Sequence, residues 1–302
     1  MDSAFLDRHD LVLIEAAIVE RLRRDSRVEL HPRLVHAALL YDEPGRDELR
    51  KIYRSYVGVA RQARLPLLLC TPTWRANRER LEEAGIGRDL NRDAVRFLKD
   101  LRKVPGAPGP PILIGGLIGC RNDCYKPEEG LSADDSEAFH SWQIDRLAQA
   151  GVDFLIAETL PSIREAVGIA NAMAATRVPF VVSFVIDRRG RLLDGTPLAE
   201  AVGTIDHAAA HRPLGFMVNC AHPTFLCAAT QPPSLFERLI GFQANASSLD
   251  HADLDGASQL QADDLSSWGE EMLTLNRRYG VKILGGCCGT GVEHLRCLTE
   301  GR

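Results

Sequence analysis

Three cysteines of this chain have types and spacing that could build a metal site. Cys287 and Cys288 are adjacent in a glycine-rich stretch at 285–290, and Cys220 follows an apolar run at 214–219. Flanking glycines let the backbone turn so that neighbouring side chains face one point. Three cysteine ligands leave one position of tetrahedral Zn²⁺ open, as in catalytic zinc sites, and sulfur ligands favour zinc over magnesium or calcium. The pattern predicts a Zn²⁺ site at Cys220, Cys287 and Cys288.

A zinc ion with three thiolate ligands would favour sulfur chemistry. Three thiolates outweigh the charge of the metal and leave a net negative centre, which is a poor Lewis acid but holds a further thiol well. Coordination deprotonates a thiol outright, and the sulfur stays electron-rich enough to attack carbon. The site therefore predicts S-alkylation of a small-molecule thiol acceptor by a cationic methyl donor.

Eight short apolar runs alternate with longer helical stretches along the chain. The runs cover residues 11–14, 65–70, 112–118, 152–157, 179–185, 214–219, 239–243 and 281–286. Continuous apolar runs are typical of strands buried on both faces. Helices are predicted over residues 47–64, 134–151, 198–210 and 262–280 and from residue 161 onward. This alternation predicts a single-domain (β/α)8 TIM barrel over residues 1–302, with a doubly wound open sheet as the alternative.

In such barrels the chemistry lies where the strands end. Residues at or just after the eight runs include Glu15, Cys70, Thr71, Thr73, Glu158, Thr159, Asn219, Cys220, Asn245, Cys287 and Cys288. Cys120 and Cys124 form a second thiol pair that zinc could use instead, whereas Cys70, Cys227 and Cys297 are predicted to pack in the core. The stretch 105–111, rich in proline and glycine, is predicted to be a rigid turn before the third strand.

Composition excludes several classes of protein. The chain has 302 residues, eight cysteines, 36 basic and 41 acidic residues, a net charge of −5 and 45% hydrophobic residues. Without a basic block, no nucleic-acid surface is expected. No apolar run approaches the roughly 20 residues of a membrane helix, and the N-terminus lacks the features of a secretory signal. We therefore expect a cytoplasmic enzyme with reduced thiols; a homo-oligomer is compatible with the sequence.

Several segments together resemble a known family. The closing stretch from Ile283 to Thr290, the Val218-Asn219-Cys220 segment with Pro223, and the stretches 151–159 and 193–198 resemble the homocysteine S-methyltransferase family. These zinc-dependent (β/α)8 barrels include betaine-homocysteine methyltransferases and the homocysteine domain of cobalamin-dependent methionine synthase. The resemblance implies that Cys220 is the first zinc ligand and that Glu158 holds the amino group of homocysteine.

The chain departs from the family pattern in three places. Glu15-Ala16-Ala17 stands where the family has Asp-Gly-Gly or Asp-Gly-Ala, and alanine would be strained there if the turn needs a positive φ. Arg75 and Thr159 occupy the places of the aromatic residues that cage betaine in relatives. An inward Arg75 would bind the carboxylate of a donor, whereas an outward one would be solvated. Near residue 243 only Asn245 matches a family turn that contains Tyr-Pro-Asn.

These observations predict a zinc-dependent S-methyltransferase that moves a methyl group from a sulfonium donor, with S-methylmethionine favoured, to the zinc-bound thiolate of homocysteine, giving methionine. The predicted substrate-binding residues are Glu158, Glu15, Ala16, Thr71, Asn219, Asn245 and Arg75. One alternative is a different small thiol or selenol acceptor, because the Glu15 segment has diverged. The other is a zinc-binding or thiol-redox protein without transfer activity.

Overall fold

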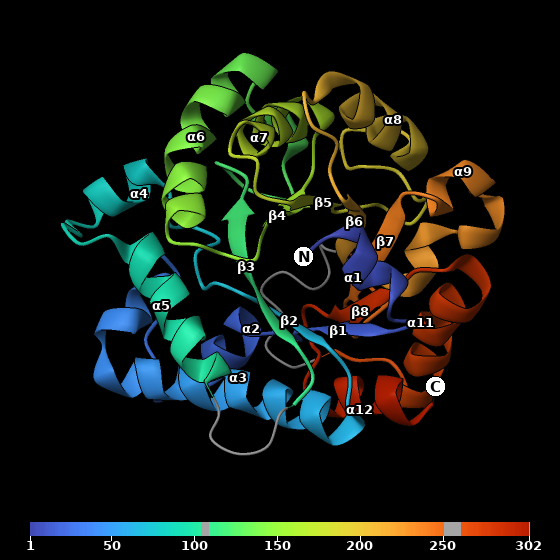
Figure 1. Cartoon of the computed structure of the whole chain (residues 1–302), viewed down its shortest axis with the longest axis horizontal. Helices are drawn as coiled ribbons and strands as arrows, with labels where there is room; N and C mark the ends of the chain where they lie inside the picture. The colour runs from blue at the N-terminus through green and yellow to red at the C-terminus, as the bar shows by residue number, and fades with distance from the viewer. Residues whose placement is uncertain (104–108, 251–260, 302) are drawn as a thin grey trace.

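The protein forms a closed barrel of eight parallel strands in sequence order, with β8 pairing back onto β1 (Figure 1). The computed structural model describes residues 1–103, 109–250 and 261–301. The strands are β1 (Val12–Ile14), β2 (Leu67–Cys70), β3 (Ile112–Gly119), β4 (Phe154–Leu160), β5 (Phe180–Phe184), β6 (Gly215–Ala221), β7 (Leu239–Ala244) and β8 (Ile283–Gly286). Each apolar run of the sequence contributes one strand. The predicted (β/α)8 barrel is confirmed, and the open-sheet alternative is wrong.

Helices surround the barrel and cover its outer face (Figure 1). They are α1 (Ser3–Asp7), α2 (Val19–Arg23), α3 (Glu43–Ala63), α4 (Arg78–Glu83), α5 (Leu90–Arg102), α6 (Ala133–Gln149), α7 (Ile163–Ala175), α8 (Leu198–Ala208), α9 (Pro233–Phe236), α11 (Leu265–Tyr279) and α12 (Val292–Glu300), with short 3-10 helices η1 (Ala37–Tyr41), η2 (Pro127–Glu129), η3 (Pro223–Leu226) and η4 (Ala228–Thr230). The helices predicted from the sequence correspond to α3, α6, α7, α8 and α11. In α11, for example, the Asp264 side chain caps the first turn and Gly280 ends the helix with a φ of 74°.

The turn predicted over residues 105–111 lies largely outside the described residues, so it stays a prediction. Within the described ranges, every helix is too short or too polar to cross a lipid bilayer.

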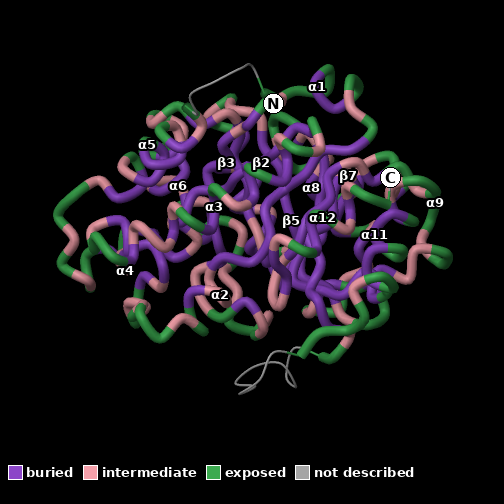
Figure 2. The backbone as a smooth tube through the Cα atoms, turned by 90° about the horizontal axis from the view of Figure 1, so that it is seen from below, coloured by how far each residue is buried: buried purple, intermediate pink, exposed green. Residues whose placement is uncertain are grey.

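The inside of the barrel changes from apolar to polar along its axis. The apolar side chains of its interior cluster are Val12, Ile14, Leu68, Leu117, Phe154, Ile156, Val181, Met217 and Ile283, together with Phe5 and Leu6 of α1. α1 lies over this apolar end of the barrel (Figures 1 and 2). Because side chains of a strand alternate between its two faces, the next inward positions toward the carboxyl ends can be read off directly. Ile156 is followed by Glu158, Val181 by Ser183, and Met217 by Asn219. This polar end is the mouth of the barrel, where the predicted site residues gather.

The glycine at 285 is required by the closure of the barrel. Gly285 lies on β8 beside β1, where an added Cβ would collide with the carbonyl oxygen and side chain of Ile14. Overpacking of this kind typically costs about 1–3 kcal/mol. We therefore expect Gly285→Ala to lower the free energy of unfolding by that amount in urea denaturation. The matched control is Gly203→Ala in α8, where no atom lies within 4 Å of the added Cβ; it should raise stability by up to about 1 kcal/mol. Equal effects of the two substitutions would contradict this prediction.

Candidate functional site

The three predicted thiols converge at the mouth of the barrel. Cys220 lies near the end of β6, and Cys287 and Cys288 directly follow β8. Their three sulfur atoms lie within 4.8 Å of one another. The backbone N–H of Cys287 donates to the carbonyl of Ala244 (2.7 Å), and that of Cys288 donates to Oδ1 of Asn245 (3.1 Å). Asn245 therefore fixes the turn that presents Cys288, and its predicted contact with substrate stays a prediction.

The thiols of Cys220 and Cys287 resist ionisation in the absence of a cation. The pKa of Cys220 is raised because it donates hydrogen bonds to Cys287 and Cys288 and because it is buried. The pKa of Cys287 is also raised. The hydrogen bond from Cys220 lowers it, but the hydrogen bond to Cys288, burial and the charge of Cys288 together raise it by more. Thiolates around tetrahedral zinc at about 2.3 Å lie about 3.8 Å apart, a spacing that this cluster can provide. The donor set thus fits a soft divalent metal, whose charge would remove the barrier to ionisation.

Two strand ends that carry site residues are irregular. Cys220 has a φ of 53° and Thr159, which follows Glu158, has a φ of 61°. The register of β6 against β7 shifts between Asn219 and Ala221, and that of β4 against β5 shifts after Ala157. A positive φ is strained for residues other than glycine, above all for a β-branched residue. Bulges of this kind redirect side chains. Cys220 follows the inward Asn219, so alternation alone would point it outward, and the irregular end of β6 turns it toward the mouth.

Asn219 holds these two irregular ends together. Its Oδ1 accepts hydrogen bonds from the backbone N–H of Thr159 (2.8 Å) and the hydroxyl of Ser183 (2.7 Å), and its Nδ2 donates to Oγ1 of Thr159 (2.7 Å). Thr159 Oγ1 in turn lies 3.9 Å from Sγ of Cys220. The sequence predicts that Asn219 binds substrate; its amide is instead used to link β4, β5 and β6, and a further contact with substrate stays a prediction.

Glu158 is an inward carboxylate whose side chain remains partly exposed at the mouth. Burial raises its pKa to about 7, while a hydrogen bond from the thiol of Cys70, 3.7 Å from Oε1, lowers it. A carboxylate with so few partners is suited to binding a cationic group.

Glu15 is more deeply placed than the sequence suggests. Its Oε2 accepts a hydrogen bond from the backbone N–H of Cys70 (2.7 Å), and burial raises its pKa well above the usual range. Neither Ala16 nor Ala17 has a positive φ, so the strain considered for this turn does not arise. The N–H of Ala17 donates to Oγ1 of Thr290 (3.3 Å). The roles of Glu15 and Ala16 toward an acceptor stay predictions, because their described contacts are structural.

Arg75 is not solvated. It is buried, its Nη1 donates to the carbonyls of Cys120 (2.9 Å) and Asn122 (2.5 Å), and its guanidinium lies 4.1 Å from the ring centroid of Trp74. It therefore ties the segment after β2 to the segment after β3. Thr71 is also buried, with its hydroxyl accepting from the N–H of Leu117 (2.9 Å). A direct role of Arg75 or Thr71 in binding substrate stays a prediction.

The remaining cysteines do not join the cluster. Among the described residues, the one group of three or more potential metal ligands is Cys220, Cys287 and Cys288. Burial raises the pKa of Cys120 to about 12, and its Sγ donates to the carbonyl of Asn122 (3.4 Å). Cys227, at a left-handed turn after η3, and Cys297 in α12 are only half-buried, so the prediction that they pack in the core is wrong, whereas Cys70 is buried as predicted.

Several residues at the mouth are not apparent from the sequence. Gln243 on β7 and Trp74 after β2 each have a buried polar atom, Oε1 and Nε1, without a hydrogen-bond partner in the described parts of the chain. Gln243 ends an apolar run just as Asn219 does, which could have marked it. The pKa of Tyr125 is raised first by burial and then by the charges of Cys220 and Cys288, so this ring lies near the cluster. No sequence signal marks Tyr125, because it lies in an irregular segment.

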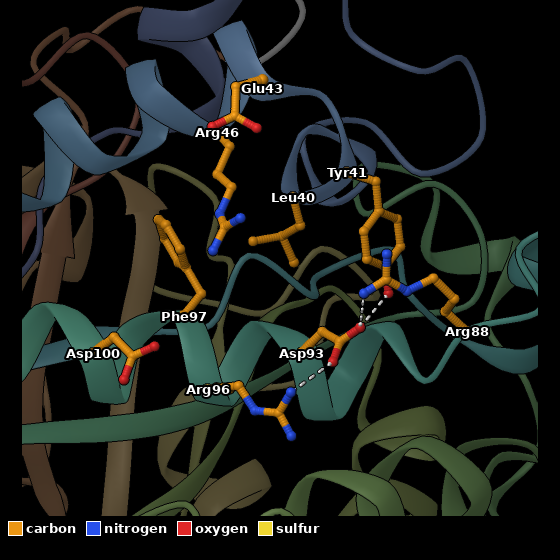
Figure 3. Close-up of a pocket in the computed structure, with 9 residues that line it drawn as sticks. All are labelled: Leu40, Tyr41, Glu43, Arg46, Arg88, Asp93, Arg96, Phe97 and Asp100. Carbon is orange, nitrogen blue, oxygen red and sulfur yellow. Dashed lines mark hydrogen bonds and ion pairs between the residues drawn. The ribbon is translucent and has the colours of Figure 1, made fainter.

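A pocket of about 280 Å³ lies elsewhere, on the outer side of the barrel between η1, α3 and α5 (Figure 3). Asp93 in this pocket already accepts hydrogen bonds from Tyr41 (2.9 Å) and Arg88 (3.2 Å) and lies 3.9 Å from Arg96. None of its lining residues belongs to the barrel mouth. We therefore place the functional site at the mouth.

Comparison with known proteins gives a consistent result. Residues 12–301 match the model of the family described as homocysteine S-methyltransferase. The chain is 24% identical to homocysteine S-methyltransferase of Escherichia coli, over 95% of this chain and 94% of that protein, and 25% identical to homocysteine S-methyltransferase 4 of Zea mays, over 90% and 84%. The crystal structure of the E. coli homocysteine methyltransferase MmuM in its metallated form has the same fold, with a TM-score of 0.76, 21% identity and coverage of 99% of both chains.

The raised pKa of Glu158 makes stability depend on pH. Its folded pKa of about 7 exceeds the usual 4.5, so the folded state binds the proton more tightly and stability falls as pH rises from about 4.5 to about 7. The slope cannot exceed about 1.4 kcal/mol per pH unit. We expect Glu158→Gln to remove this loss, so that its stability advantage over the wild type grows across that window in urea unfolding of the reduced, metal-free protein. An exposed glutamate on α11, changed in Glu271→Gln, is the control; the same pH trend in both variants would refute the assignment.

Proposed function

The chain belongs to the homocysteine S-methyltransferase family, and from that premise we propose that it transfers a methyl group from S-methylmethionine to homocysteine at a zinc ion held by Cys220, Cys287 and Cys288. Methyl transfer to homocysteine is the activity of the family, which makes a zinc-binding or redox protein without transfer activity the poorer explanation. The donor, the identity of the metal and the residue roles are what the proposal adds.

The observation that carries the proposal is the convergence of three thiols, within 4.8 Å of one another, at the mouth of a barrel, where the charge of Glu158 acts on Cys287. Zinc, when bound there, supplies a deprotonated and electron-rich acceptor sulfur. Asn245 positions Cys288, and Asn219 with Thr159 positions Cys220. Because thiols must stay reduced to bind metal, we place the enzyme in the cytoplasm.

Glu158 is proposed to hold the ammonium group of the acceptor. Its carboxylate is the inward, partly exposed acid of the mouth, and an ammonium group would keep it ionised near neutral pH. Glu15 is less suited to bind the ammonium group, because its Oε2 already accepts a hydrogen bond from the backbone N–H of Cys70. The interaction would orient homocysteine with its sulfur toward Cys220, Cys287 and Cys288.

The transfer itself is a single displacement. The acceptor sulfur attacks the methyl carbon of the sulfonium donor, the new sulfur–carbon bond forms, and the old one breaks with its electron pair staying on the departing sulfur. Both products are then neutral thioethers, and with S-methylmethionine both are methionine. Arg75 is proposed to bind the carboxylate of the donor through guanidinium N–H groups other than those of Nη1, which donates to backbone carbonyls.

Betaine is the less suitable donor for this site. A quaternary ammonium group is bound by the faces of aromatic rings. The ring of Trp74 already carries the guanidinium of Arg75 on one face, and Thr159 adds no ring beside Glu158, which leaves Tyr125 as the described ring near the thiols. A different small thiol or selenol remains the second candidate for the acceptor, favoured by the structural use of Glu15.

Replacing one thiol tests the metal site. We expect Cys288→Ser to lose bound zinc and at least 100-fold in methyl transfer, because the ligands of a three-cysteine site are each needed for affinity. The control is Cys297→Ser in α12, whose Sγ contacts the carbonyl of Leu265 at 3.6 Å and not the cluster; it should keep both. Metal analysis after reducing purification gives the stoichiometry, and a Cys288→Ser protein with full activity would disprove the proposed site.

A donor and acceptor panel tests the substrates. Zinc-loaded protein should form methionine from S-methylmethionine and homocysteine, and with betaine should do so at least tenfold more slowly. Mass spectrometry of the products against a set of small thiols and selenols distinguishes the acceptors. If another thiol is methylated and homocysteine is not, the second candidate is correct; a preference for betaine would overturn the proposed donor.

A further inference from the structure

Cys70 is a buried thiol directly beside Glu158. Its Sγ lies 3.7 Å from Oε1 of Glu158, and the residue is 1% exposed within the interior cluster of the barrel. Both polar atoms of its backbone are also fixed. The N–H donates to Oε2 of Glu15 (2.7 Å), and the carbonyl accepts from the hydroxyl of Tyr53 (2.8 Å). With the backbone held on both sides, the sulfur has little freedom to move away from Glu158.

The side chain of Glu15 accepts a hydrogen bond at the point where the backbone hydrogen bonds between β1 and β2 end. β1 stops at Ile14, and the N–H of Glu15 makes a last strand-like bond to the carbonyl of Leu68 (3.2 Å). The following inward residue of β2 is Cys70, whose N–H would be buried without a strand partner. A buried N–H without an acceptor is costly, so the side chain of Glu15 replaces the missing carbonyl. Glu15 thereby sets the position of Cys70.

The thiol of Cys70 remains protonated in this setting. Burial raises its pKa well above the usual range, and the charges of Glu15 and Glu158 raise it further. A protonated thiol is a hydrogen-bond donor, so it can satisfy a carboxylate oxygen. In the described residues Oε1 of Glu158 has this one donor, and Oε2 has none.

We propose that Cys70 is a positioning residue for the acceptor: its thiol holds Oε1 of Glu158 and leaves Oε2 directed at the ammonium group of a thiol substrate. The chain of contacts runs from Glu15 through the backbone and sulfur of Cys70 to Glu158. Cys70 thus favours acceptors that carry an ammonium group by acting through Glu158, and it lies outside the group of three thiols that would hold the metal. This inference rests on the proposed function, because it takes Glu158 as the ammonium-binding group.

Binding of two acceptors, measured without any methyl donor, tests this role. Isothermal titration of the zinc-loaded protein compares homocysteine with 4-mercaptobutanoate, which lacks only the amino group. In Cys70→Ala the Kd for homocysteine should rise about fivefold, the factor that corresponds to a hydrogen bond of about 1 kcal/mol, with the Kd for 4-mercaptobutanoate unchanged. Cys70→Ser keeps a donor at the same place and should restore the preference for homocysteine. Cys297→Ala, which removes a thiol away from the mouth, should change neither Kd.

The outcomes separate this inference from the proposed function. Wild-type protein that binds both acceptors equally would overturn the role of Glu158 and with it the inference. Wild-type protein that prefers homocysteine, together with an equal preference in Cys70→Ala, would overturn the inference alone. Weaker binding of both acceptors by the same factor would show that Cys70 only fills space and would also overturn it. Zinc content and thermal unfolding of each variant verify that the site and fold are intact.

Discussion

The amide of Asn219 is the interaction on which the arrangement of the mouth depends. Glu158 faces inward by strand alternation, and Cys220 can face the same side because β6 ends irregularly with a positive φ at Cys220, beside a positive φ at Thr159 directly after Glu158. Such backbone conformations cost of order 1–3 kcal/mol each and persist only where surrounding contacts hold them. Three hydrogen bonds of the Asn219 amide, with Thr159 and Ser183, supply those contacts across β5. The strain is therefore a cost of bringing Cys220 of β6 to the same side as Glu158 of the non-adjacent strand β4.

The barrel supplies the rigid frame for this strain. Its interior is apolar from the end covered by α1 up to the level of Ile156 and Met217 and becomes polar within one further inward position. The polar side chains at the mouth thus lie above a packed apolar interior and have no space to move further into the barrel. Gly285 plays the complementary part on β8, since a side chain there would push β8 away from β1 and move the two cysteines that follow it. The closed and packed barrel therefore fixes the positions of the polar side chains at its mouth.

Much of this could be predicted from the sequence, and the limits have physical causes. Buried strands are continuous apolar runs, so the sequence predicts all eight strands and places the site at their carboxyl ends. Adjacent cysteines between glycines were equally visible, and the structure brings them to Cys220. Bulges at Thr159 and Cys220 were not readable, because neither residue is one that favours a positive φ. Glu15 accepts a hydrogen bond from the N–H of Cys70, and Arg75 donates to a carbonyl after β3. Both bonds form because backbone groups at strand ends lack a partner within the sheet. Side-chain patterns do not report unpaired backbone groups.

The charges at the mouth suit the proposed reaction better than acid–base chemistry. A thiolate and a sulfonium cation combine into two neutral thioethers, so charge is lost on the way to the transition state. Surroundings that solvate charge poorly then penalise the reactants more than the transition state. The mouth has this character. Hydrogen bonds among the thiols together with burial raise the pKa values of Cys220 and Cys287, and burial raises the pKa of Glu158, so their anions are poorly stabilised until a cation arrives. Metal, acceptor ammonium and donor sulfonium are all such cations, and each would favour the ionised form of the group it meets. The same property of the mouth, acidic groups with few positively charged partners, therefore favours both the binding of these cations and the reaction.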